Sequence, residues 1–166
     1  TVMKRMTDGK TADLILTTGG VSVGEKDLLP GVIENLTGNV LFHGIQVKPG
    51  MPTMLSVVMG APVLSLSGNP FAVEALFEVL AGGYLTDMEA SRYLQKNQMK
   101  ILKQTFVKTG KMKRIVTGRC DESGVYLPQI QKNGQLKNGI GSNCLVIFPE
   151  GERTYTEGEA VRVIRI

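Results

Sequence analysis

The chain has no tryptophan, and only 5% of its 166 residues are aromatic. It therefore lacks the row of aromatic side chains on which single-stranded nucleic acids stack. Its two cysteines, Cys120 and Cys144, are too few for a disulfide scaffold, and without a Cys-x-x-Cys pair they do not predict a zinc or iron–sulfur site. We interpret both as small buried apolar side chains of a cytoplasmic protein. The apolar runs fall short of the roughly 18 residues that a membrane span needs.

Histidine occurs once, at His43, so a Ser-His-Asp triad or a histidine metal site would have to be built around this residue alone. Its setting in LFHGI favours a strand-facing side chain instead. The glycine-rich segments match neither the G-x-G-x-x-G nor the G-x-x-x-x-G-K-[ST] pattern. The sequence therefore gives no support to a dinucleotide-dependent dehydrogenase or an ordinary nucleoside triphosphatase.

Charge and pattern both change at one point of the chain. Residues 1–90 hold five basic and nine acidic residues, whereas residues 91–166 hold fourteen basic and six acidic ones. We therefore predict two domains, 1–90 and 91–166, that meet near residues 89–96. The first alternates strands with helices and is predicted to be α/β, with a parallel-type sheet and flanking helices. The second has short strands between turns and is predicted to be a small all-β barrel or sandwich.

Local signals predict the main elements of the first domain. ADLILTTGG, residues 12–20, is typical of a buried parallel strand and its exit loop. TMLSVVM and PVLSLS predict a hairpin around Gly60. DLLPGVIENL and NPFAVEALFEVL, residues 27–36 and 69–80, predict helices, the second capped by Asn69 with Pro70 at its first position.

Three segments are candidates for holding an anion. TTGGVSVGEKD and SLSGNPFAVEAL each follow a strand with a glycine turn and start a helix, where free N–H groups attract phosphate. Lys48, in QVKPGMP, would end a further strand and add a positive charge. We expect Gly19–Gly24, Lys48 and Gly68–Pro70 to converge on one cleft at the carboxyl edge of the sheet. The alternatives are an internally satisfied turn and a solvated lysine.

Two further features have open interpretations. Asp27 would either hold Mg²⁺ or polarise a water, or else simply cap a helix. The segment from Lys96 to Arg119 has eight basic residues and no acidic one. It is compatible with RNA binding, but we favour a solvated face of β-strands because its charges are spread over several elements.

The segments DLILTTGGVSVGEKD, VKPGMP and LSGNPFA occur in this order at suitable intervals, and NGIGSNCLVIFPEG and YTEGEAVRVIRI follow near the end. Together they resemble the MoeA family, the molybdopterin molybdenumtransferases, which includes the C-terminal part of gephyrin. The resemblance covers nearly the whole chain. It implies a C-terminal fragment of a longer protein, with the later part of a molybdopterin-binding α/β domain followed by the family's terminal β domain.

The resemblance also implies a function in molybdenum cofactor biosynthesis. The family's transferase reaction is the Mg²⁺-dependent insertion of molybdate into adenylylated molybdopterin with release of AMP, and the fragment alone is expected to be inactive. Matching positions make Asp27 and Lys48 catalytic residues, with Asp27 also a metal ligand. The implied cofactor-binding residues are Thr18, Gly19, Gly20, Ser22, Gly24, Ser67, Gly68, Asn69 and Pro70. Ser67 departs from the proline that the family often has.

The implied biology is a cytoplasmic homodimer that binds neither nucleic acid nor membrane, with a molybdopterin adenylyltransferase as pathway partner. Two alternatives stay open. One is a non-catalytic module that binds pterin or serves as a scaffold. The other is an enzyme like the molybdopterin adenylyltransferases, which share the TTGG loop but not the β domain.

Overall fold

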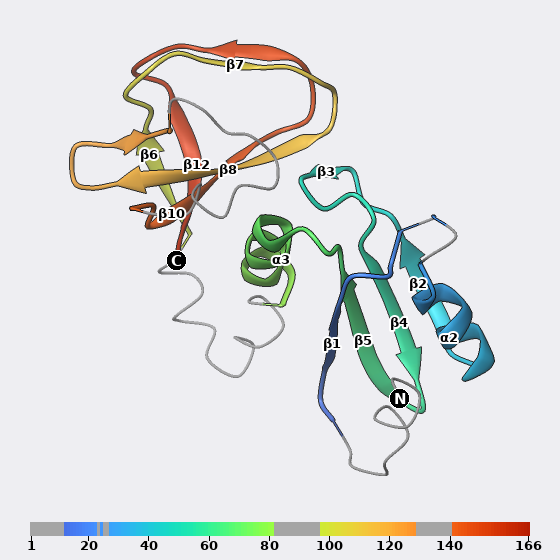
Figure 1. Ribbon diagram of the computed structural model, residues 1–166. Helices are drawn as coiled ribbons and strands as arrows, with labels where there is room; N and C mark the ends of the chain where they lie inside the picture. Colours follow the sequence, from blue (N-terminus) through green and yellow to red (C-terminus); the bar gives the residue numbers. More distant parts are fainter. Residues whose placement is uncertain (1–11, 23, 25–26, 82–96, 129–140) are drawn as a thin grey trace. The chain divides into compact units, whose positions relative to one another are not determined.

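The computed structural model describes residues 12–22, 24, 27–81, 97–128 and 141–166 (Figure 1). The chain divides into two compact units. Unit 1 comprises Thr1–Ile45 and Gly50–Val73, and unit 2 comprises Gln46–Pro49 and Glu74–Ile166. The predicted junction near residues 89–96 lies outside the described residues, so the boundary between 1–90 and 91–166 stays a prediction.

Unit 1 is built on a four-stranded sheet with the order β1-β5-β4-β2. Its strands are β1 (Ile15–Thr18), β2 (Asn39–His43), β4 (Met54–Val58) and β5 (Ala61–Leu66). β1 runs parallel to β5, as expected, but the expectation that it is buried is wrong, because its residues are half-buried or exposed and Leu16 is 42% exposed. The β4–β5 and β2–β4 ladders are antiparallel. The predicted hairpin is confirmed, with Met59 and Gly60 at φ 51° and 83° in its turn. Two successive positive φ angles are typical of the tight turns that suit the twist of a hairpin.

Helix α2 (Leu29–Asn35) covers one face of this sheet (Figure 1). Pro30 lies in its first turn, as predicted, because a missing N–H costs nothing there. Apolar side chains of α2, β4 and β5 form the core of the unit together with one residue of the loop after β1. The buried members of this cluster are Val21, Leu29, Ile33, Met54, Val58 and Val63.

The second predicted helix is also present. α3 (Pro70–Leu76) starts at Pro70 and continues as a π-helical segment, η1 (Phe77–Ala81). The backbone N–H of Ala72 donates to Asn69 Oδ1 at 3.2 Å, so Asn69 caps the helix as predicted.

Unit 2 contains a six-stranded sheet, ordered β3-β8-β10-β12-β6 with β9 paired to β8, and a two-stranded β7–β11 ribbon. The strands are β3 (Val47–Lys48), β6 (Asn97–Ile101), β7 (Phe106–Lys108), β8 (Lys113–Cys120), β9 (Val125–Tyr126), β10 (Cys144–Phe148), β11 (Arg153–Tyr155) and β12 (Ala160–Arg165). β3 is parallel to β8, and the other ladders described in this unit are antiparallel. The expected α/β and all-β parts are therefore both observed, although the sequence analysis did not predict β11.

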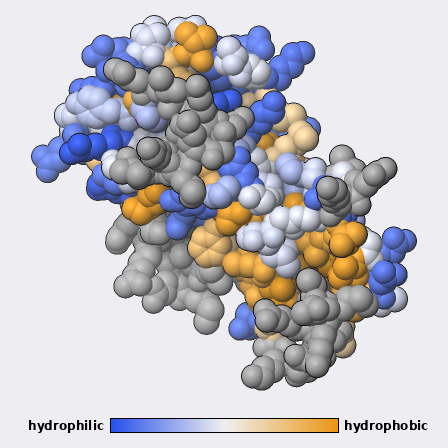
Figure 2. Space-filling view, viewed as in Figure 1, coloured by the Kyte–Doolittle hydropathy of each residue, from blue (hydrophilic) through white to orange (hydrophobic). Residues whose placement is uncertain are grey.

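The core of unit 2 lies around β10, all five residues of which are buried. The Phe148 ring stacks on Phe106 with centroids 4.5 Å apart and meets Tyr155 at 4.7 Å. Cys120 and Cys144 are free and buried, which confirms their interpretation as core residues. On the face shown in Figure 2, hydrophilic residues predominate over the strands of this unit. Among the helices that the structure describes, none has both the length and the apolar character needed to cross a bilayer.

Candidate functional site

Two of the predicted loops lie side by side in unit 1. The parallel register of β1 and β5 places Thr18 beside Leu66, so both strands deliver their carboxyl ends to the same edge of the sheet. Immediately beyond, the Gly19 N–H donates to Leu66 O at 2.9 Å. A Cβ added to Gly68 would lie 3.4 Å from the Gly19 Cα. The backbones of the two loops therefore lie within van der Waals range of each other at this edge of the sheet.

The loop after β1, of which the structure describes residues 19–22 and 24 and which we call the glycine loop, is held by backbone hydrogen bonds at Gly19, Gly20 and Gly24. Gly19 and Gly20 have φ of 80° and 67°, which glycine adopts without strain. Gly20 O accepts from Leu29 N at 3.0 Å. Among the described residues, no acceptor is found for the N–H groups of Gly20 and Ser22. Such N–H groups beside a strand end are suited to an anion.

Asp27 does not cap α2. The N-cap position is Leu28, which makes no side-chain cap bond. The Gly24 N–H instead donates to Asp27 Oδ2 at 3.0 Å, and the Asp27 N–H donates to Gly24 O at 2.9 Å. The helix-cap interpretation is therefore wrong, and the side chain helps to shape the glycine loop.

The surroundings of Asp27 fit Mg²⁺ in one respect. Within the part of the chain that the structure describes, no three His, Cys, Asp or Glu side chains cluster to hold a metal. Mg²⁺, however, is commonly held by one or two carboxylates together with waters and substrate phosphates. Asp27 Oδ1, for which no hydrogen bond is found within the described residues, has a free acceptor for such an ion.

The loop after β5 presents its residues to different degrees. Ser67 is buried, with 9% of its surface exposed, whereas Gly68 and Pro70 are exposed. Asn69 uses its side-chain oxygen to cap α3. A ligand at this loop would therefore meet Gly68 and Pro70 more readily than Ser67, and the binding role of all four stays a prediction.

Lys48 lies in a different sheet from the one we expected. It ends β3, which pairs with β8 in unit 2, with Val47 beside Lys113 and Lys48 beside Arg114. The expectation that Lys48 ends a strand of the α/β sheet is therefore wrong. The structure brings Gly19 and Gly68 together, and a single cleft that also contains Lys48 stays a prediction.

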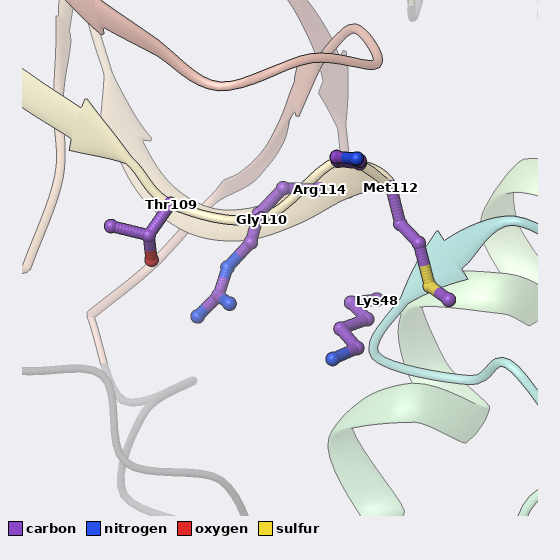
Figure 3. A pocket seen from close by; sticks show the side chains of 6 residues that line it. Lys48, Thr109, Gly110, Met112 and Arg114 are labelled. Atoms are coloured by element: carbon purple, nitrogen blue, oxygen red, sulfur yellow. The ribbon is translucent and has the colours of Figure 1, made fainter.

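Lys48 lines a pocket of about 320 Å³ within unit 2 (Figure 3). The pocket is lined by Lys48, Thr109, Gly110, Lys111, Met112 and Arg114. Three of these side chains are cationic and none is acidic. The Lys48 ammonium and the Arg114 guanidinium extend into the same space (Figure 3). Arg114 Nε is buried without a hydrogen-bond partner in the described structure, so it has a donor available for an anion.

Residues 109–112, which we call the pocket loop, are held by the turn that precedes β11. The Lys108 side chain is 2% exposed, and its Nζ donates to Gly110 O at 2.8 Å and to Gly151 O. The Gly151 N–H donates to Lys111 O at 2.8 Å, and the Gly110 N–H donates to Glu152 Oε1 at 3.1 Å. These bonds fix the backbone from which Lys111 projects.

Lys111 and Arg114 were not predicted as site residues. Both belong to the basic segment that we expected to be a solvated face of β-strands. That expectation is wrong for Lys108, which is buried, and it overlooks the pocket. The signal that could have identified them is the glycine turn in KTGKMKR, which gathers several cations in a tight loop.

The chain matches a family model described as "Probable molybdopterin binding domain" over residues 2–87, slightly more than half of its length. The chain belongs to this family. It is 29% identical to the molybdopterin molybdenumtransferase of Staphylococcus aureus strain COL over 157 residues, which are 92% of this chain and 38% of that protein. The corresponding protein of Staphylococcus epidermidis strain ATCC 12228 is 27% identical over the same shares. The predicted membership of the MoeA family is thereby confirmed, and the chain spans well under half the length of these relatives.

Solved structures show the same fold. One is described as the molybdopterin biosynthesis MoeA protein from Pyrococcus horikosii, with a TM-score of 0.75 and 27% identity over 93% of this chain and 37% of that one. Another, a molybdenum cofactor biosynthesis protein from Pyrococcus furiosus, has a TM-score of 0.67 at 18% identity over 95% of this chain and 69% of that one, and shows similarity of fold alone. The chain therefore resembles the MoeA proteins both in sequence and in fold.

Proposed function

We propose that the intact protein carrying this chain is a transferase that inserts molybdate into adenylylated molybdopterin, with Mg²⁺, and releases AMP. The observation that carries this proposal is the pairing of β3 with β8, which joins Lys48 to Lys111 and Arg114 in one cationic pocket. Molybdate is an oxyanion, and adenylylated molybdopterin carries a pyrophosphate link. Both substrates call for charge-assisted donors of the kind found here.

In this proposal, different residues bind the two substrates. The N–H groups of the glycine loop and the adjacent Gly68 backbone hold the phosphates of the pterin substrate. The pocket cations hold molybdate, with the Arg114 guanidinium offering the fixed pair of donors that suits an oxyanion. Asp27 would hold Mg²⁺ through Oδ1, and when bound this ion offsets the charge that develops as the link to AMP is cleaved.

We also propose a cellular compartment, an oligomeric state and a partner for the protein. We place it in the cytoplasm as a homodimer that receives its substrate from a molybdopterin adenylyltransferase. The named relatives are transferases, which favours this proposal over a non-catalytic pterin-binding module.

The experiment is to measure AMP release by the intact protein with Mg²⁺, molybdate and adenylylated molybdopterin, comparing Asp27→Asn with the wild type. Asparagine keeps an oxygen for the Gly24 N–H but removes the charge. We expect turnover to fall roughly 100-fold, with little change in stability, because a carboxylate that holds the metal is lost. Glu34→Gln, which removes an exposed carboxylate from α2, is the matched control and should leave turnover unchanged.

Two results would contradict the proposal. If Asp27→Asn lowers the melting temperature but leaves AMP release unchanged, Asp27 serves only to shape the loop. If the wild type binds the pterin substrate tightly but never releases AMP, the protein is a binding module.

A further inference from the structure

The single histidine of the chain holds the glycine loop. His43 Nε2 lies 2.7 Å from Val21 O. A carbonyl oxygen can only accept, so Nε2 carries the hydrogen and the imidazole is the donor. The side chain is otherwise exposed, which separates this contact from ordinary core packing.

An irregularity in β2 aims His43 at this carbonyl. The register of β2 against β4 shifts between Val40 and Phe42, so that His43 is opposite Met54. Leu41, between these two residues, is the extra residue of the bulge. Without it, Phe42 would be opposite Met54, and the His43 side chain would lie on the other face of the sheet. Met54 belongs to the core cluster that contains Val21, so the shift places the imidazole on the face where the glycine loop packs.

The bond has a consequence for the next residue. The carbonyl of Val21 and the N–H of Ser22 belong to one planar trans peptide unit and point in opposite directions. A donor that fixes the carbonyl therefore also fixes the direction of the Ser22 N–H. That N–H has no acceptor among the described residues, so a ligand can use it.

We propose that His43 is a positioning residue, which orients the Val21–Ser22 peptide so that its N–H is presented to a phosphate group. The inference rests on the proposed function in that it takes the ligand of the glycine loop to be a phosphate. His43 touches neither substrate nor metal in this role. Its hydrogen bond restricts the rotation of the Val21–Ser22 peptide before the anion binds. Preorganisation of this kind raises the affinity for the anion without adding a contact to it.

The test compares His43→Gln and His43→Leu in the intact protein, with inorganic pyrophosphate as the probe. The glutamine amide can place a donor near the position of Nε2, whereas leucine cannot. We expect His43→Leu to raise the Kd for pyrophosphate about five-fold and to shift the amide signal of Ser22, and His43→Gln to stay within about two-fold of the wild type. Asn39→Ala, at the exposed far end of the same strand, should change neither quantity.

The two readouts separate this inference from the proposed function. If the wild type does not bind pyrophosphate but the Ser22 amide still responds to His43→Leu and not to His43→Gln, the positioning role is supported and the phosphate role of the loop is refuted. If the wild type binds pyrophosphate and the two variants behave alike, the positioning role is refuted. An unmoved Ser22 amide in His43→Leu refutes it as well.

Discussion

Arg114→Met is expected to weaken the binding of molybdate or inorganic phosphate more than Lys48→Met does. Unit charges about 4 Å apart attract by about 1 kcal/mol in water and about 4 kcal/mol near a protein surface of lower effective dielectric. Lys48 is exposed, so its attraction for the anion should be close to the value of about 1 kcal/mol in water. Its loss should therefore raise Kd about five-fold. Arg114 is half-buried, and its Nε has no hydrogen-bond partner among the described residues. Its loss should therefore weaken anion binding by about 2 kcal/mol, or about 30-fold in Kd.

The assay is a calorimetric titration of the intact protein with each anion at about 0.05 M and 0.5 M salt. Lys113→Met is the matched control, since Lys113 precedes Arg114 on β8, is exposed and does not line the pocket. Successive residues of a strand face opposite sides, so this variant removes the same charge from the other face. Higher salt should weaken wild-type binding and reduce the difference between Lys48→Met and the wild type, because exposed charges are screened most.

Equal weakening of anion binding by Lys113→Met and Arg114→Met would contradict this prediction. The anion would then respond to the overall positive charge of unit 2 and not to the pocket. Unchanged Kd values for Lys48→Met and Arg114→Met at both salt concentrations would contradict it as well.

Two further predictions concern the stability of unit 2. Lys108→Met keeps an apolar stem but leaves Gly110 O and Gly151 O without their donor, so the free energy of unfolding should fall by about 2 kcal/mol in denaturant titrations; an unchanged value would contradict the anchoring role. Burial, with Cys120 adjacent, raises the pKa of Cys144 from 9.0 to about 12, so the unfolded thiol ionises first as pH rises. The contribution of this thiol to stability should be complete below about pH 9 and decline toward pH 12. Cys144→Ala should make that decline shallower by up to about 1.4 kcal/mol per pH unit, and parallel curves of unfolding free energy against pH for the two proteins would refute this.

Much of the fold was predictable because its signals are local. The apolar run before Gly19, the Asn69-Pro70 start of α3 and the turn at Gly60 each depend on a few neighbouring residues, and all three are observed. The adjacency of the glycine loop and Gly68 was also predictable, because both segments consist of a strand, a glycine turn and the start of a helix. Backbone propensity and capping carry such information within a short window of sequence.

The assignment of Lys48 failed because its strand has only two residues. β3 is too short to have a periodicity, and its partner β8 lies more than sixty residues further along the chain. The same limit hid the role of Asp27, whose position just before a helix is typical of a cap. Its carboxylate instead accepts a hydrogen bond from the Gly24 N–H. This contact depends on the conformation of the loop, which the residue type alone does not predict.

The register of β3 against β8 places Lys48 directly beside Arg114, so two cations line the same pocket from neighbouring strands. Like charges that face each other across a ladder are unfavourable for folding by a few tenths of a kcal/mol to about 1 kcal/mol. Lys111 adds a third positive charge from the pocket loop, and none of the described residues that line the pocket is acidic. A sequence under selection for stability alone would place an acid or a neutral residue at one of these positions. An oxyanion between the cations turns their repulsion into attraction, so the unfavourable pairing is itself an argument that the pocket binds one.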